Sequence, residues 1–298
     1  MSADWINSRA AALNPSAPSS PMPTMDNQRG IAAGGVASSL LDDMKRRILI
    51  LGGTTESRQL AASLAARDDL SLMLSLAGRT TSPLVQPVPT RSGGFGGAEG
   101  LAAYLRDNRV DVLIDATHPY AGTISANAMQ AASQTGTPLL SLRRPPWQAQ
   151  PGDRWTQVAD AEVAAYALGP EPQCVFLAVG RQEVAAFACQ PQHRYVVRTV
   201  DPVDPPLAVP HAKYILARGP FSEAEDRELL SSHGIDVVVA KNSGGDATYG
   251  KIAAARSLGI RVLLLQRPFE QPATSVSTVA EAIAWLDHAV TSGIDRGV

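Results

Sequence analysis

Glycine and threonine residues that could bind phosphate follow an apolar, strand-like segment near residue 50. Residues 47–51 are followed by Gly52, Gly53, Thr54, Thr55 and Glu56. Glycines at a strand end let backbone N–H groups approach a pyrophosphate, and the N-terminus of a following helix attracts its negative charge. The run lacks the G-x-G-x-x-G spacing, and the threonine hydroxyls could donate to phosphate in its place. A tight strand-to-helix turn capped by Thr55 would give the same pattern.

The end of the next strand-like segment indicates which dinucleotide would fit. Residues 70–76 are followed by Ala77, Gly78, Arg79 and Thr80. Sites for NADH usually end this strand with Asp or Glu, whereas an arginine accommodates the 2′-phosphate of NADPH. The segment has no acid, and Arg79 stands where the phosphate would lie. The pattern therefore favours NADPH, although a solvated loop arginine is the alternative.

A third segment, residues 110–114, ends with side chains that could bind a ligand or move a proton. Asp115, Thr117, His118 and Tyr120 follow it. They belong at the carboxyl edge of a sheet, where open α/β folds bind their ligands. We take Asp115 and Thr117 as cofactor ligands and His118 and Tyr120 as candidate catalytic residues. The alternatives are that Asp115 caps the next helix and that His118 is structural.

Basic and small polar residues follow the strand-like segments of the second half. Because these positions converge on one sheet edge, they predict a site for a polyanion. The run that begins at Lys241 resembles a phosphate-binding loop but lacks the Walker spacing, which excludes an NTPase. The candidate substrate ligands are Arg181, Arg218, Lys241, Asn242, Ser243, Gly244 and Lys251.

Alternating strands and helices must position these residues. Such alternation predicts parallel βαβ units with right-handed crossovers. We expect two consecutive Rossmann-like α/β domains with parallel sheets and a cleft between them: a disordered leader over residues 1–43, a cofactor domain over 44–148 and a substrate domain over 149–298. Strands are expected at residues 47–51, 70–76, 110–114, 138–142, 175–179, 195–199, 214–217, 236–240 and 261–265.

Composition excludes several other classes of protein. The net charge of −2 gives no basic excess for nucleic acid. The two cysteines, Cys174 and Cys189, are too few for a disulfide framework or a zinc site, and we expect no metal site. No apolar run has the length of a membrane span, and the first residues lack a secretory pattern. These features predict a cytoplasmic protein.

The ordered set of motifs resembles the precorrin-6A reductase and cobalt-precorrin-6A reductase family. The resemblance covers about residues 47–267. It is carried in the first half by residues 51–56, 77–79, 93–97 and 115–119, and in the second half by residues 218–221, 241–245 and 267–268. It implies an NADPH-dependent reductase that adds hydride to a ring double bond of precorrin-6A, or of its cobalt form, and gives precorrin-6B in cobalamin biosynthesis.

A substrate rich in acetate and propionate groups agrees with the basic edge of the second half. The resemblance also implies transient contacts with neighbouring pathway enzymes. His118, Tyr120 or bound water could supply the proton that follows the hydride. The alternatives are a reductase of a smaller substrate and a non-catalytic NADPH sensor. A Tyr-x-x-x-Lys pair would favour the first, but Ile124 stands at the fourth position after Tyr120.

Overall fold

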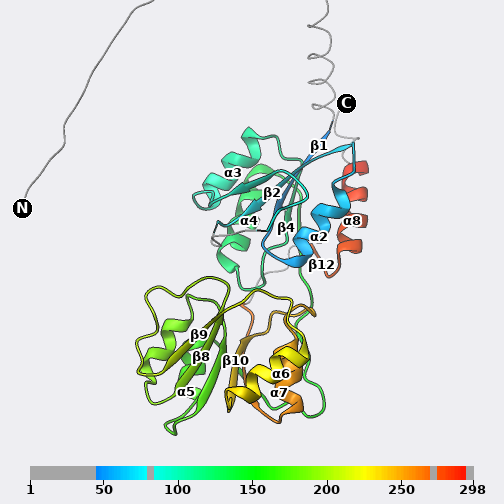
Figure 1. Cartoon of the computed structure of the whole chain (residues 1–298). Helices are drawn as coiled ribbons and strands as arrows, with labels where there is room; N and C mark the ends of the chain where they lie inside the picture. Colours follow the sequence, from blue (N-terminus) through cyan, green and yellow to red (C-terminus); the bar gives the residue numbers. More distant parts are fainter. Residues whose placement is uncertain (1–44, 79–83, 269–273, 293–298) are drawn as a thin grey trace, which may run out of the picture. The chain divides into compact units, whose positions relative to one another are not determined.

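The computed structural model describes residues 45–78, 84–268 and 274–292. The predicted leader, residues 1–43, lies outside the described residues, as do Arg79 and Thr80. The described chain forms two α/β domains, each with a six-stranded parallel sheet (Figure 1). This confirms the predicted fold class.

The first sheet has the strand order β12-β5-β4-β1-β2-β3. All of its pairs are parallel, and helices follow β1, β3 and β4, as expected for parallel strands joined by crossovers. The strands are β1 (Arg46–Leu51), β2 (Leu70–Leu76), β3 (Thr90–Ser92), β4 (Val112–Asp115), β5 (Leu139–Leu142) and β12 (Ser275–Val276). The helices are α2 (Thr55–Leu64), α3 (Gly97–Asp107), α4 (Gly122–Thr135) and α8 (Val279–Ser292).

Alternation along β1 explains how helices cover both faces of this sheet. Ile48 and Ile50 pack with α2 and α8, whereas Leu49 and Leu51 pack with α3 and α4. Successive side chains of a strand point to opposite faces, so a continuous apolar run is buried on both sides. The central strand is therefore fully covered, and its carboxyl end is the part left for chemistry.

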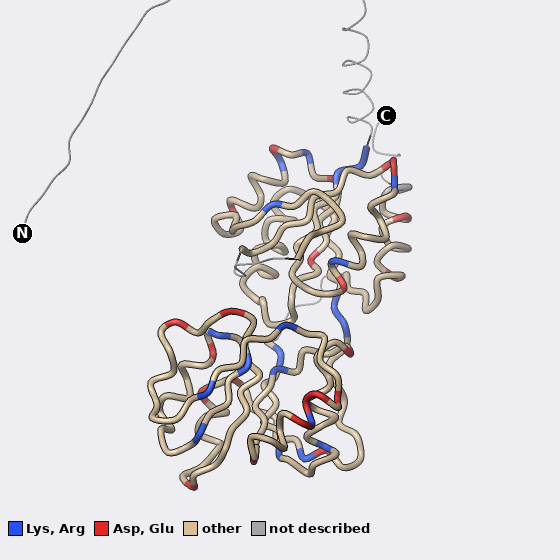
Figure 2. Tube along the Cα trace, in the orientation of Figure 1, with Lys and Arg blue, Asp and Glu red and all other residues tan. Residues whose placement is uncertain are grey.

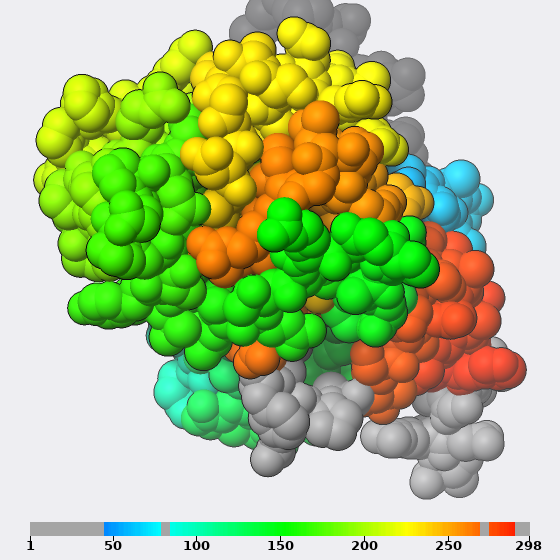
Figure 3. Space-filling view, turned by 90° about the horizontal axis from the view of Figure 1, so that it is seen from below, coloured from blue at the N-terminus to red at the C-terminus, as the bar shows by residue number. Residues whose placement is uncertain are grey.

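The second sheet repeats this arrangement with the order β6-β11-β10-β7-β8-β9. α6 and α7 lie side by side on one face (Figures 1 and 3), and α5 and the 3-10 helix η1 cover the other. The strands are β6 (Trp155–Val158), β7 (Cys174–Ala178), β8 (Arg194–Thr199), β9 (Ala212–Leu216), β10 (Val237–Lys241) and β11 (Arg261–Leu265). The helices are α5 (Ala161–Ala167), η1 (Val184–Cys189), α6 (Glu223–Ser232) and α7 (Gly250–Ser257).

The strand order reverses once in each sheet, between β1 and β4 and between β7 and β10. Open α/β sheets bind ligands outside the carboxyl ends of the strands at such a reversal. In the first sheet, the loops at this point contain residues 52–54 and 116–121. In the second, they contain residues 179–183 and 242–249. Most of the predicted site residues therefore lie at the two reversals.

The C-terminal part of the chain differs from the predicted domain boundary. β12 pairs with β5, with Ser275 opposite Ser141, and Ala282 and Leu286 of α8 join the core that contains Ile48. Residues 275–292 thus complete the first domain, although the prediction gave 149–298 to the second. The chain therefore crosses between the domains twice, near residues 143–147 and near residue 267. In the described ranges, no helix is long and apolar enough to cross a membrane.

Candidate functional site

The loop after β1 is held by its own helix. Thr54 is the N-cap of α2: its hydroxyl accepts from the N–H of Ser57 (3.1 Å) and donates to the carbonyl of Ala116 (2.9 Å). The N–H groups of Gly53 and Thr54 donate to the Ser57 hydroxyl. The alternative of a Thr55 cap is therefore wrong, and the Thr54 hydroxyl is used within the fold. The exposed Thr55 and the first-turn amides of α2 are the groups of this loop that can face a phosphate.

The loop after β4 is held by a buried ion pair that sequence reasoning did not find. Arg143 donates to Oδ2 of Asp115 (2.6 Å), to the Ser125 hydroxyl (2.5 Å) and to the carbonyl of Thr117 (2.6 Å). Asp115 also accepts from the N–H and the hydroxyl of Thr117. Asp115 does not cap α4, whose N-cap is Ala121. Asp115 and Thr117 thus shape the loop that carries His118.

His118 lies among basic side chains from both domains. Its pKa is lowered to about 3, first by burial and then by the positive charges of Arg144, Lys241, Arg267 and Arg143. Nδ1 accepts from the N–H of Tyr120 (3.3 Å), which places the single ring proton on Nε2. The imidazole is therefore neutral near pH 7, and Nε2–H can donate one hydrogen bond to a bound group.

Tyr120 joins the two domains. Its hydroxyl donates to the carbonyl of Leu265 at the end of β11 and accepts from the N–H of Asn242 (2.7 Å). Burial is the main cause that raises the pKa of Tyr120 to about 12. The phenol proton is thus already bound by a backbone carbonyl. This geometry fits a structural tie better than the predicted catalytic role.

The connecting segment at residues 143–147 lies between the predicted cofactor loop and the second sheet. Arg144 pairs with Glu56 on α2 (2.6 Å), and its Nε donates to the carbonyl of Ser243 (2.7 Å). Arg267, in the returning segment, donates to the carbonyls of Asn242, Ser243 and Arg144. Figure 2 shows basic residues along this connection. A short hollow beside it is lined by Thr54, Glu56, Thr117, Pro119, Leu142, Arg143 and Arg144.

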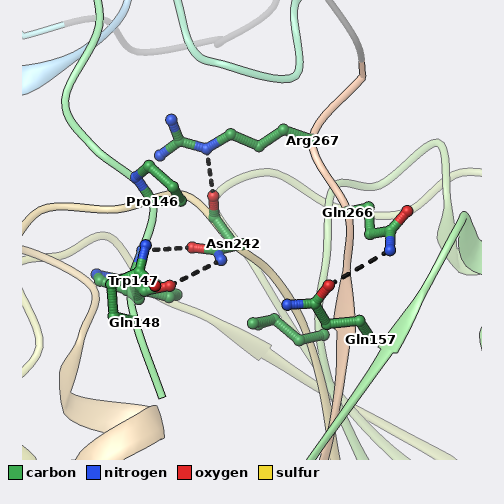
Figure 4. Close-up of a pocket in the computed structure, with 8 residues that line it drawn as sticks. Pro146, Trp147, Gln148, Gln157, Asn242, Gln266 and Arg267 are labelled. Carbon is green, nitrogen blue, oxygen red and sulfur yellow. Dashed lines mark hydrogen bonds between the residues drawn. The ribbon is translucent and has the colours of Figure 1, made fainter. Parts of the chain in front are cut away.

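The predicted substrate loop that starts at Lys241 packs against this connection. The Asn242 side chain accepts from the N–H of Trp147 (2.8 Å) and donates to its carbonyl (3.2 Å), as Figure 4 shows. Gly244 has φ of 69°, and a Cβ there would lie 2.1 Å from the Pro145 carbonyl oxygen. Asn242, Ser243 and Gly244 thus hold the connecting segment, and their role as substrate ligands stays a prediction. Beside them is a cavity of about 230 Å³ lined by Pro146, Trp147, Gln148, Gln157, Asn242, Leu264, Gln266 and Arg267.

The predicted substrate cations differ in how far they are exposed to solvent. Arg181 and Arg218 are exposed, and Lys241 pairs with Glu183 across the second strand-order reversal (2.5 Å). Lys251 is only 5% exposed and donates to the carbonyl of Thr248 (2.5 Å). Lys251 is the second residue of α7, directly after the loop at residues 242–249, and its role as a substrate ligand stays a prediction.

Comparisons with known proteins agree with this geometry. Residues 47–287 match the family model described as precorrin-6x reductase CbiJ/CobK. A precorrin-6A reductase of Sinorhizobium sp is 54% identical over 85% of this chain and 98% of its own length, and one of Rhodobacter capsulatus is 48% identical over 85% and 99%. A cobalt-precorrin-6A reductase of Priestia megaterium is 28% identical over 79% and 96%. A solved CobK precorrin-6A reductase superposes with a TM-score of 0.79 at 48% identity, covering 82% of this chain and 97% of that one.

Proposed function

The chain belongs to the precorrin-6x reductase family of oxidoreductases in cobalamin biosynthesis, and from this premise we propose that it uses NADPH to reduce a ring double bond of precorrin-6A, giving precorrin-6B. Two relatives named precorrin-6A reductase are 54% and 48% identical to this chain, whereas one named cobalt-precorrin-6A reductase is 28% identical. This difference favours the metal-free substrate. We also propose a cytoplasmic reaction, which the two free cysteines support.

One observation carries the proposal: the positive charges of Arg144, Lys241, Arg267 and Arg143, from the connecting segments and the second sheet, all act on His118 beside the cofactor loop. A macrocycle whose rim carries many carboxylates would be attracted to such a site, because several cations act together in a partly buried region. His118 lies in the loop that flanks the first strand-order reversal, next to the α2 N-terminus. The cofactor and a polyanionic substrate would therefore meet at one place.

The residues at this reversal fit a dinucleotide. The first-turn amides of α2 would hold the pyrophosphate, with Thr55 as a hydroxyl donor, and Gly53, which has open space where a Cβ would stand, would let it approach. NADPH supplies the hydride, and the protein contributes mainly by holding the reacting atoms together. Neutral His118 can orient a substrate carboxylate through Nε2–H, and Tyr120 holds the domains in register. Since His118 is neutral near pH 7 and the Tyr120 hydroxyl is bound to a backbone carbonyl, we assign to water the one proton that must follow the hydride.

The direct test is oxidation of NADPH by the purified protein with precorrin-6A, followed at the absorption bands of cofactor and tetrapyrrole together. The proposal expects NADPH and precorrin-6A to be consumed in equal molar amounts. NADPH binding without any change in the tetrapyrrole spectrum would instead support a sensor of the cofactor.

We predict that Arg79→Ala raises the KM for NADPH and leaves the KM for NADH nearly unchanged. Arg79 follows β2, where an arginine would contact the 2′-phosphate. Loss of a charge-assisted contact to a phosphate costs about 1.5–3 kcal/mol, or roughly ten- to a hundredfold in KM. Steady-state kinetics with each cofactor measure the effect. An equal loss for both cofactors would mean that Arg79 supports the loop instead.

We also predict that Arg218→Ala and Lys241→Ala each weaken the binding of precorrin-6A and leave the affinity for NADPH unchanged. Both cations follow strands at the carboxyl edge of the second sheet. Binding should fall with rising salt, since the attraction involves partly exposed charges. Separate titrations of each variant with NADPH and with the tetrapyrrole measure this, and Arg227→Ala on α6 is an exposed control. Unchanged tetrapyrrole affinity in both variants would exclude these residues from the substrate site.

A further inference from the structure

The glycine-rich loop at residues 93–97 has no role in the function proposed so far. It follows β3 and leads into α3, so it lies at the same carboxyl edge as the loop after β1. β3 is two strands from β1, which corresponds to about 10 Å across the sheet. A dinucleotide whose pyrophosphate lies at β1 would extend its adenosine half across β2 towards this loop.

The side chain of Arg91 on β3 is held in place by contacts to β2 and to this loop. Its Nη1 donates to the Ser75 hydroxyl (2.7 Å) and to the carbonyl of Gly93 (3.1 Å), and its Nη2 donates to the carbonyl of Gly94 (3.0 Å). The guanidinium carbon lies 3.8 Å from the centroid of the Phe95 ring. Such contacts hold the planar group in one orientation, so little freedom would be lost when it binds an anion.

Arg91 has no carboxylate partner within the part of the chain that the structure describes. Its side chain contacts one hydroxyl, two carbonyls and the rings of Phe95 and Tyr104. These use three N–H donors, which leaves donors on Nε and Nη2. A fixed, half-buried guanidinium with donors to spare is suited to a planar, charge-assisted contact with a phosphate.

The backbone amides at the start of α3 add positive potential at the same loop, opposed in part by Glu99 in the first turn. Gly96 is the N-cap and provides no side-chain cap for the first amides of this 11-residue helix. The loop must pass close to the helix, since a Cβ on Gly100 would lie 1.7 Å from the carbonyl oxygen of Phe95. Uncapped amides at a helix N-terminus favour an anion, so the helix and Arg91 act in the same direction.

We propose that Arg91, held by Phe95 and by the loop at residues 93–97, binds the 2′-phosphate of NADPH and so sets the cofactor preference. This inference rests on the proposed use of NADPH. It assigns to β3 a contribution that is separate from that of Arg79 after β2. The apolar ring of Phe95 holds the guanidinium, and the spare N–H edge makes the contact.

The test compares two probes that differ only in the 2′-phosphate: adenosine 2′,5′-bisphosphate and adenosine 5′-phosphate. Each is titrated calorimetrically into the whole protein and into Arg91→Ala, Arg91→Lys and the control Arg106→Ala, which removes an exposed cation of α3. We expect Arg91→Ala to lower the affinity for the bisphosphate by about ten- to a hundredfold and to leave the affinity for the monophosphate nearly unchanged. Arg91→Lys, which keeps the charge but loses the planar fork, should fall between, and Arg106→Ala should match the parent.

The ratio of the two affinities within one variant separates recognition from support of the loop. If Arg91→Ala weakens both probes equally, or neither, Arg91 only holds the loop and the inference is wrong. A parent protein that binds neither NADPH nor the bisphosphate would instead contradict the proposed function, and this subsite with it. Thermal unfolding of each variant verifies that the titrated protein is folded, and the intermediate Arg91→Lys variant keeps the test valid if Arg91→Ala does not fold.

Discussion

Arg143→Met should lower the free energy of unfolding by about 3–5 kcal/mol, because it leaves a buried carboxylate without its partner. The side chain of Asp115 is 2% exposed and that of Arg143 is 11% exposed, with 2.6 Å between them. Methionine keeps much of the apolar volume of arginine, so the loss measures the ion pair and its hydrogen bonds. Urea unfolding followed by circular dichroism gives the value.

Arg46→Met is the matched control for this prediction. Arg46 pairs with Asp111 at 3.3 Å, but both side chains are about one third exposed. Exposed pairs contribute only about 0–1 kcal/mol, since water screens them. A further variant, Arg143→Met with Asp115→Asn, should recover part of the loss because the buried charge is gone. If Arg143→Met costs no more than Arg46→Met, the pair is not what holds the loop after β4.

The central strands were predictable because each is a continuous apolar run buried on both faces. The apolar runs at residues 48–51 and 237–240 both carry this pattern, and both lie in central strands. β3, β6 and β12 were missed because they are short edge strands. β12 has only two residues, and its place beside β5 depends on a long-range pairing that no local pattern encodes.

The site residues that directly follow strands were predictable from the sequence. Those in the two segments that connect the domains were not. Gly52–Glu56 and His118 follow strands, so topology brings them to one edge. Arg143 and Arg144 are not among the predicted site residues, because no local pattern marks them and their partners are distant in sequence. The apolar run 252–255 after Lys251 was the signal that could have shown its burial, because a helix that is apolar all round is buried.

Lys251 makes stability depend on pH in a way that a surface lysine does not. Burial is the main cause that lowers its pKa to about 7, followed by the positive charge of Arg198; Asp226 acts in the opposite direction, and Arg144 lowers the pKa further. The ammonium group has the carbonyl of Thr248 and the ring of Trp147 as neighbours. These contacts compensate incompletely for the water that the charge has lost.

The direction of the pH effect follows from proton counts. Between about pH 7 and the ordinary lysine pKa near 10.4, the unfolded chain holds a proton on Lys251 that the folded chain has released. Stability contributed by this residue therefore rises with pH across that window, with a slope approaching about 1.4 kcal/mol per pH unit. Below pH 7 both states hold the proton, so the cost of burying the charge is fully present there.

Lys251→Met should remove this slope, so the difference between variant and parent is the quantity to measure. Urea unfolding at intervals from pH 6 to pH 10 gives the free energy of unfolding of the variant and of the parent. The variant should exceed the parent most at pH 6, and this difference should shrink by several kcal/mol towards pH 10. Taking the difference cancels the titration of other groups, including Tyr120 and Tyr195, whose pKa values burial raises. Arg227→Met, at an exposed position of α6, controls for the loss of a positive charge alone. A difference that stays level from pH 6 to pH 10 would mean that the folded protein keeps Lys251 protonated, with a partner able to offset its burial.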